Sequence, residues 1–96
     1  MLIRVVRLTL QEDKVEEFEQ IISENQRFIR NYEGCHHLEL WRDADQPHIF
    51  MTYSHWENAD VLNQYRHSDF FRTIWAKLKL LFADKPQAYS VFKHQV

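Results

Sequence analysis

The sequence contains very little of the residues that identify several common classes of protein. Its 96 residues include one cysteine, Cys35, and one glycine, Gly34. A single cysteine cannot form a disulfide within the chain, which argues against a disulfide-stabilised extracellular scaffold and favours a cytoplasmic location. No apolar segment approaches the roughly 20 residues of a membrane span. Arg4 and Arg7 interrupt the apolar start and exclude a signal-peptide core, so we expect no membrane association.

Charge is nearly balanced, with 12 basic against 14 acidic residues and a formal net charge of −2. Because no basic stripe is present to follow a phosphate backbone, we expect no nucleic-acid partner. The length predicts a single domain over residues 1–96, and no repeat, linker or low-complexity segment divides it.

The first third of the chain has the pattern of a strand followed by a helix. Residues 2–10 alternate as a strand and place two sets of side chains on opposite faces. The sets are Leu2, Val6, Leu8 and Leu10, against Ile3, Val5 and Arg7. Asp13 and Glu16 have the spacing of a capping box, which predicts the start of a helix. That helix is expected to end before Gly34, the predicted left-handed residue.

The middle of the chain has the pattern of a hairpin and a divided helix. Residues 36–42 are expected to pair with residues 48–56 around a turn rich in Asp and Pro. Ser68 has the character of a helix cap, so residues 58–82 are predicted to form two helical pieces. The first piece is expected to start at Asn58 or at Ser54.

With a last strand at residues 88–93, the order β-α-β-β-α-β predicts an α+β, ferredoxin-like fold. Both helices would then cover one face of a four-stranded antiparallel sheet. The other face should be polar in a monomer, yet the strands carry large apolar residues at both parities, such as Leu40 against Trp41 and Phe50 against Met51. We therefore expect a homodimer in which two sheets stack through their open faces about a two-fold axis.

Three stretches of sequence together resemble one known family. The stretches "EGCHHLELWRD", "YSHWENADVLNQY" and "HSDFFRTIW" are similar to the antibiotic biosynthesis monooxygenase domain, a dimeric α+β barrel family. Its pattern has Gly-Cys after the first helix, Trp at a strand end before the second helix, and Ser-x-x-Phe within the second helix. This sequence matches the pattern at Gly34, Cys35, Trp56, Ser68 and Phe71. The resemblance spans essentially the whole chain.

The resemblance implies a cofactor-independent monooxygenase that oxidises an electron-rich aromatic, such as a quinol or a polyphenol, with O₂. No metal, flavin or haem is then expected. Two alternatives stay open: a non-oxidative isomerase of a small carbonyl compound, and a non-enzymatic dimer that binds a small ligand. In the haem-degrading branch of the family, three functional positions align with Tyr65, Trp75 and Arg7 of this sequence. Trp75 has no lone pair for iron, so haem degradation is not predicted.

Six residues are candidates for the site. They are Arg7 and His67 as catalytic residues, and Asn25, Tyr65, Phe71 and Trp75 as substrate-binding residues. Arg7 would stabilise a substrate anion, or it would pair with Glu39 or with the partner subunit. Asn25 lies on the apolar stripe of the first helix and would orient the substrate, or bind main chain.

The remaining candidates surround the break in the second helical region. Tyr65 and Trp75 carry polar tips and are expected to line a pocket, whereas packing in the core is the preferred interpretation of Phe71. His67 could act as a general base, with a solvent-facing or capping role as the alternative. His37 and His55 could be cross-strand neighbours, but no third ligand is identified, so no metal site is predicted.

Overall fold

Four antiparallel strands form one sheet in the order β2-β3-β1-β4 in the computed structural model, which describes residues 1–96. The strands are β1 (Leu2–Thr9), β2 (Cys35–Arg42), β3 (Ile49–Trp56) and β4 (Gln87–Val91). The helices are α1 (Val15–Arg30), α2 (Ala59–Arg66) and α3 (Asp69–Leu78), with 3-10 turns η1 (Glu12–Lys14) and η2 (Lys79–Leu81). None of these helices combines the length and apolar character needed to cross a bilayer. The element order confirms the predicted ferredoxin-like α+β fold.

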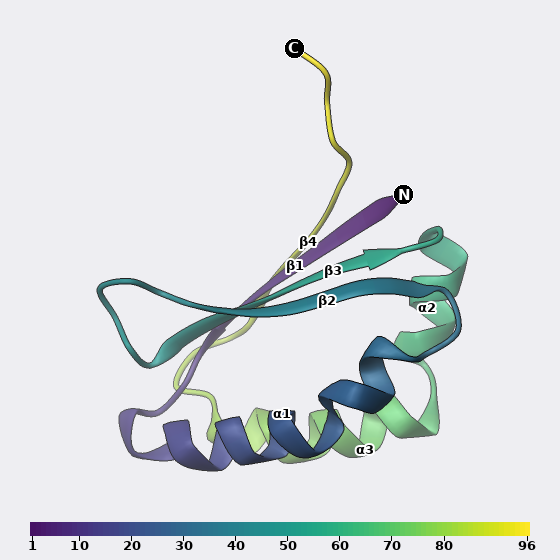
Figure 1. The fold of residues 1–96 in the computed structure, drawn as a ribbon. Helices are drawn as coiled ribbons and strands as arrows, with labels where there is room; N and C mark the ends of the chain where they lie inside the picture. The colour runs from purple at the N-terminus through teal and green to yellow at the C-terminus, as the bar shows by residue number, and fades with distance from the viewer.

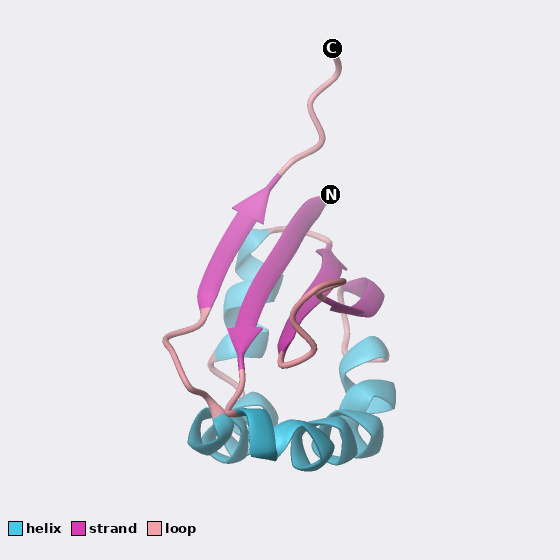
Figure 2. Ribbon diagram, turned by 90° about the vertical axis from the view of Figure 1, so that its left-hand side faces the viewer, coloured by secondary structure: helices cyan, strands magenta, loops and turns pink.

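All three helices cover the same face of the sheet (Figures 1 and 2). The main core lies between the helices and the sheet. It is a cluster of eight buried residues: Leu8, Leu10, Phe18, Ile22, Phe50, Ile74, Leu78 and Leu81. A second cluster, formed by Leu2, Trp56, Leu62 and Tyr65, joins α2 to the other end of the sheet. The fold therefore has two separate packing centres under one sheet.

Helix starts follow the predicted chemistry at α2 and α3 but not at α1. The side-chain oxygens of Asn58 and Ser68 accept hydrogen bonds from the main-chain N–H groups three residues on, at 2.9 and 3.1 Å. The break between the two predicted helical pieces is confirmed at this point. The predicted capping box of Asp13 and Glu16 is wrong. Asp13 lies inside the turn η1, and α1 begins after it without a side-chain cap.

The turn between α1 and β2 depends on Gly34. α1 ends at Arg30, and the Cys35 N–H then donates to the carbonyl of Tyr32 at 2.9 Å. Gly34 has a φ of 89° in this turn, as predicted for the left-handed residue after the helix. A Cβ at this position would lie 2.2 Å from Cγ1 of Val61 in α2. Glycine therefore permits both the turn and the close approach of α2.

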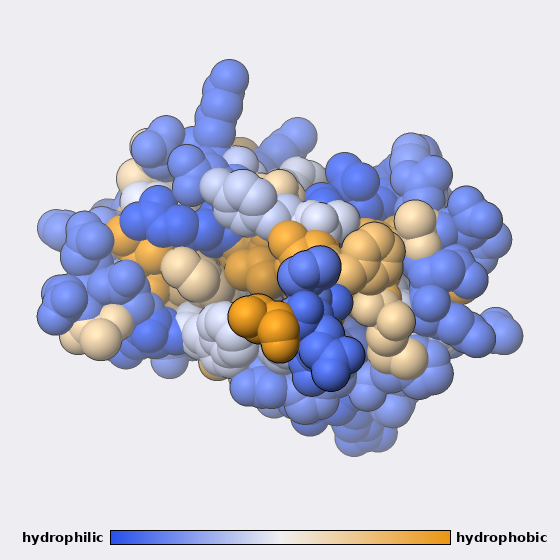
Figure 3. Space-filling model, turned by 90° about the horizontal axis from the view of Figure 1, so that it is seen from above, coloured by the Kyte–Doolittle hydropathy of each residue, from blue (hydrophilic) through white to orange (hydrophobic).

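The sheet face turned away from the helices, which we call the open face, carries the odd-numbered residues of the four strands. Cys35 is the exception, because the register shifts between Cys35 and His37. Hydrophobic side chains gather along its middle with hydrophilic ones around them (Figure 3). Trp41 stacks on Tyr53 with ring centroids 4.5 Å apart. Trp41 and Tyr89 are 40% and 53% exposed. The single chain thus leaves large aromatic surfaces in contact with water.

Candidate functional site

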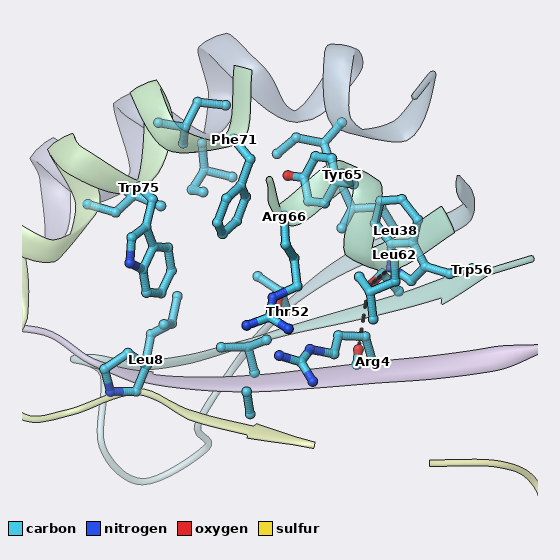
Figure 4. A pocket seen from close by; sticks show the side chains of 18 residues that line it. Arg4, Leu8, Leu38, Thr52, Trp56, Leu62, Tyr65, Arg66, Phe71 and Trp75 are labelled. Carbon is cyan, nitrogen blue, oxygen red and sulfur yellow. Dashed lines mark hydrogen bonds between the residues drawn. The ribbon is translucent and has the colours of Figure 1, made fainter. Parts of the chain in front are cut away.

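A cavity of about 260 Å³ lies between the helices and the sheet (Figure 4). Its lining is mainly hydrophobic and comes from all four strands and all three helices. Residues of both core clusters contribute to it, so the cavity occupies the space between the two packing centres. Most pockets for drug-sized ligands have volumes of about 300–1,000 Å³. This cavity is slightly smaller and suits a ligand of one or two rings.

One wall of the cavity is aromatic. Phe71 and Trp75 are one turn apart on α3, and their rings stack with centroids 5.5 Å apart and planes 17° apart. The Ser68 cap starts α3 at Asp69 and so determines which residues of the helix face the sheet. Figure 4 shows both rings directed from α3 toward the strands. A flat ring bound against this wall would contact two aromatic side chains.

Tyr65 forms the part of the wall near the end of α2. Its ring packs against Trp56, Tyr32 and Phe71 with centroid distances of 4.7, 5.0 and 5.1 Å, and the residue is only 7% exposed. Burial raises the pKa of its phenol far above the ordinary value, and the neighbouring Cys35 and Tyr32 raise it further. The hydroxyl is therefore neutral at physiological pH and available as a hydrogen-bond donor.

The polar part of the cavity is formed by two arginines on opposite walls. Arg4 comes from β1 and Arg66 from the last turn of α2, and their guanidinium groups are directed toward one another (Figure 4). Arg4 donates to Oγ of Ser90 on β4 at 2.9 Å. Burial lowers the pKa of Arg4, and the positive charge of Arg66 lowers it further. No acidic side chain lines the cavity, so a ligand meets two cationic groups and no anionic one.

The structure brings together three of the six predicted site residues. Tyr65, Phe71 and Trp75 all line the cavity. Arg7 does not, because residue 7 has odd parity on β1 and therefore lies on the open face, opposite Met51 of β3. The chain contains no ion pair between Arg7 and Glu39.

Asn25 and His67 also lie outside the cavity lining. Nδ2 of Asn25 donates to the main-chain carbonyl of Ile21 at 2.8 Å, one turn earlier in α1. His67 is exposed, and its Nδ1 donates to the carbonyl of Asn63 at 2.8 Å. Both residues thus have the main-chain contacts that were the alternatives to a site role, and their functional roles stay predictions from sequence.

Sequence reasoning missed Arg4 and Arg66 as site residues, although the pattern contained a signal for each. Arg4 has the same strand parity as Leu2 and Leu8, which were predicted on one apolar face. Arg66 follows Leu62 by four residues and therefore shares its side of a helix. A charged residue within an apolar face is the observation that identifies both.

The histidines of the open face do not form a metal site. No group of three or more His, Cys, Asp or Glu side chains is arranged to hold an ion. His37 and His55 are cross-strand neighbours with ring centroids 5.1 Å apart. His37 contacts Glu39, and Nε2 of His55 lies 2.8 Å from the Tyr53 hydroxyl. These side chains form a hydrogen-bonded network on the sheet rather than a set of ligands.

Comparisons with known proteins agree with this architecture. A conserved protein of Methanosarcina mazei Go1 superposes with a TM-score of 0.90 at 23% identity, over 98% of this chain and 94% of that one. An antibiotic biosynthesis monooxygenase superposes with a TM-score of 0.92 at 13% identity, over 99% and 100%. Rv0793 of Mycobacterium tuberculosis superposes with a TM-score of 0.88 at 14% identity, over 99% and 96%. At these identities the likeness shows the fold alone.

Sequence comparison identifies the family. A search of curated proteins found no match to the chain. The sequence profile of the family described as antibiotic biosynthesis monooxygenase matches residues 1–77, which include the aromatic wall and both arginines of the cavity. The chain therefore belongs to the antibiotic biosynthesis monooxygenase family.

Proposed function

We propose that this protein is a monooxygenase that oxidises an electron-rich aromatic, a quinol or a polyphenol, with O₂ inside the cavity. The observation that carries the proposal is the aromatic wall of Phe71 and Trp75 in an otherwise apolar cavity of one- or two-ring size. An aromatic substrate gains most from such a wall, because offset stacking adds to the burial of its faces. Family membership supports the oxidative chemistry.

The reaction balances without any further reductant, because the substrate supplies the electrons. A phenolate transfers electrons to O₂, and a bond forms between one oxygen atom and a ring carbon that carries hydrogen. Loss of that proton and cleavage of the O–O bond release water and leave a quinone. The substrate thus loses two hydrogen atoms and gains one oxygen atom. The protein has to bind, desolvate and orient the ring, and Tyr65 donates a hydrogen bond from its neutral hydroxyl.

The proposal includes a homodimer that buries the open face. Trp41, Tyr53 and Tyr89 lie on that face, and two of them are more than a third exposed. Exposed apolar patches on monomers rarely exceed a few hundred Å². A second copy with its sheet stacked on this one would cover the aromatic residues about a two-fold axis. Arg7 would then lie in the interface between subunits.

An oxygen-electrode assay with a panel of quinols and polyphenols tests the proposed reaction. Each substrate is measured with and without protein in the presence of a chelator, because quinols oxidise spontaneously with trace metals. We expect protein-dependent uptake of one O₂ per substrate and, with labelled O₂, one labelled oxygen atom in the quinone.

A pair of matched variants links the activity to the cavity. Phe71→Leu shortens the aromatic wall, whereas Phe28→Leu makes the same change on α1 at a side chain that is 59% exposed and outside the lining. Turnover should fall about tenfold or more with Phe71→Leu, the equivalent of roughly 1.4 kcal/mol in the barrier. It should be unchanged with Phe28→Leu. Uptake of O₂ at the uncatalysed rate across the panel would refute the proposal.

A further inference from the structure

We propose that the ligand of this cavity is an aromatic anion whose carboxylate or phenolate oxygen is held between Arg4 and Arg66. The inference deepens the proposed function, on which it rests for the identification of the cavity as the substrate site. It specifies which side chains hold the negatively charged oxygen of the substrate, whether that oxygen is a phenolate on the ring or a carboxylate next to it.

The two guanidinium groups are unpaired with any acid. The structure contains two ion pairs, Lys14 with Glu17 and His37 with Glu39, and both lie outside the cavity lining. Arg4 has the hydroxyl of Ser90 as its side-chain partner, and that group is neutral. Arg4 is partly buried and Arg66 is exposed, and the two cations that face one another across the apolar cavity repel. An anion between them would offset this repulsion.

The position of the arginines suits a ring-borne anion rather than a free ion. Arg4, Thr52 and Arg66 lie together in the middle of the lining, between Trp75 on one side and Trp56 on the other (Figure 4). A ring against the aromatic wall would direct an attached oxyanion toward the guanidinium groups. Arginine presents a planar fork of donors that matches a carboxylate, and it also binds a single phenolate oxygen.

The two arginines belong to two different elements, the strand β1 and the helix α2, and the core holds each element in place. Arg4 lies in the middle of β1, where it pairs with Ser54 of β3 and Ser90 of β4. Arg66 ends α2, which the second core cluster holds against the sheet through Leu62 and Tyr65. Both guanidinium groups are therefore carried by ordered elements, and a bound anion would add one contact to each wall.

Binding measured by calorimetry under anaerobic conditions tests the inference without turnover. The probes are naphthoate with its neutral counterpart naphthamide, and nitrophenolate with its neutral counterpart nitroanisole. We expect each anion to bind at least tenfold more tightly than its neutral counterpart. Arg4→Met and Arg66→Met should each weaken the anions about tenfold to a hundredfold, and should leave the neutral probes within about twofold. The two anions distinguish a carboxylate from a phenolate as the preferred group.

Arg72→Met is the matched control, because Arg72 is an exposed arginine on α3 that does not line the cavity. It should leave all four affinities unchanged. Without ligand, Arg4→Met and Arg66→Met should melt at the same temperature as the wild type or higher, since each removes a repulsion. A purely structural role predicts a lower melting temperature and an unchanged preference for anions.

Three results would overturn the inference. They are equal affinity for anion and neutral probe, the same loss of affinity in Arg72→Met as in the cavity variants, and no binding of either anion at millimolar concentration. Different results would refute the proposed oxidation and the anion site. Arginine-dependent binding of anions without O₂ uptake would refute the reaction and keep the anion site. Uptake of O₂ that survives both arginine changes would refute the anion site and keep the reaction.

Discussion

Replacement of Gly34 by alanine should destabilise the fold by about 2–5 kcal/mol, the sum of a backbone and a packing cost. The backbone cost arises because Gly34 has a φ of 89°, where a Cβ approaches the following carbonyl oxygen. A left-handed conformation costs an L-residue roughly 1–2 kcal/mol. The packing cost arises because the new methyl group would lie 2.2 Å from Cγ1 of Val61. Overpacking of this kind costs about 1–3 kcal/mol, and a β-branched residue in a helix has no alternative rotamer of similar energy.

Urea denaturation followed by circular dichroism measures the effect. With an m-value of about 2 kcal/mol/M for a small domain, the midpoint should move to lower urea by about 1–2.5 M. Protein concentration has to be the same for all variants, because dimerisation would make the apparent stability depend on it. The expected loss is a large fraction of the roughly 5–15 kcal/mol that stabilise a small domain.

A double-mutant cycle with Val61→Ala separates the two costs. In the Val61→Ala background the nearest methyl group is gone, so Gly34→Ala should cost only the backbone part, about 1–2 kcal/mol. An equal cost in both backgrounds would show that α2 does not approach Gly34 as closely as the structure has it. A cost of less than about 0.5 kcal/mol in the wild-type background would refute the whole argument, since that is the range of surface substitutions.

Three further predictions concern Arg7, the open face and the buried phenol of Tyr65. Arg7→Met should leave the affinity for naphthoate within about twofold in calorimetry, because Arg7 lies on the open face. A tenfold loss of affinity would show that Arg7 contributes to the binding site. Light scattering at micromolar concentration should give twice the chain mass of 11.8 kDa for the wild type, and Trp41→Lys should give the single mass because it places a cation in the proposed interface. A single-chain mass for the wild type would contradict the dimer. Tyr65→Phe should reduce the loss of stability in alkali, measured as the urea midpoint between pH 9 and pH 11. The unfolded phenol ionises near its ordinary value of 10.0, while the folded phenol keeps its proton to higher pH. Stability is therefore full below that value and falls above it by up to about 1.4 kcal/mol per pH unit, and the same slope in Tyr65→Phe would refute this assignment.

The fold could be predicted because its determinants are local. Strand alternation over residues 2–10, the Asp-rich turn of the hairpin and the caps at Asn58 and Ser68 each act within a few residues, and all are found in the structure. The start of α1 could not be predicted in the same way. The side chain of Gln11 donates to the carbonyls of Leu80 and Phe82, so the entry to α1 depends on a distant part of the chain.

The aromatic part of the cavity was predictable for a related reason. Phe71 and Trp75 are four residues apart in one helix, so helical geometry alone places their rings together. Tyr65 joins them because the Ser68 cap interrupts the helix and turns α3 relative to α2. Local rules thus account for one wall of the site.

The two arginines of the cavity, Arg4 and Arg66, could be predicted only in part, and Arg7 was the expected site residue on β1 instead of Arg4. Arg7 was a candidate because it shares a strand face with the apolar residues Ile3 and Val5, whereas Arg4 breaks the apolar pattern of the face that meets the helices. A pattern break on a covered face is the stronger physical argument, because a charge there has a desolvation cost that some partner must offset. Arg66 is exposed, and the signal for it is its spacing of four residues from the buried Leu62. That the two arginines meet across the cavity depends on how α2 crosses β1, and no periodicity along the chain contains that crossing. The anion expected between them follows from the same argument, because neither wall of the cavity provides an acid of its own.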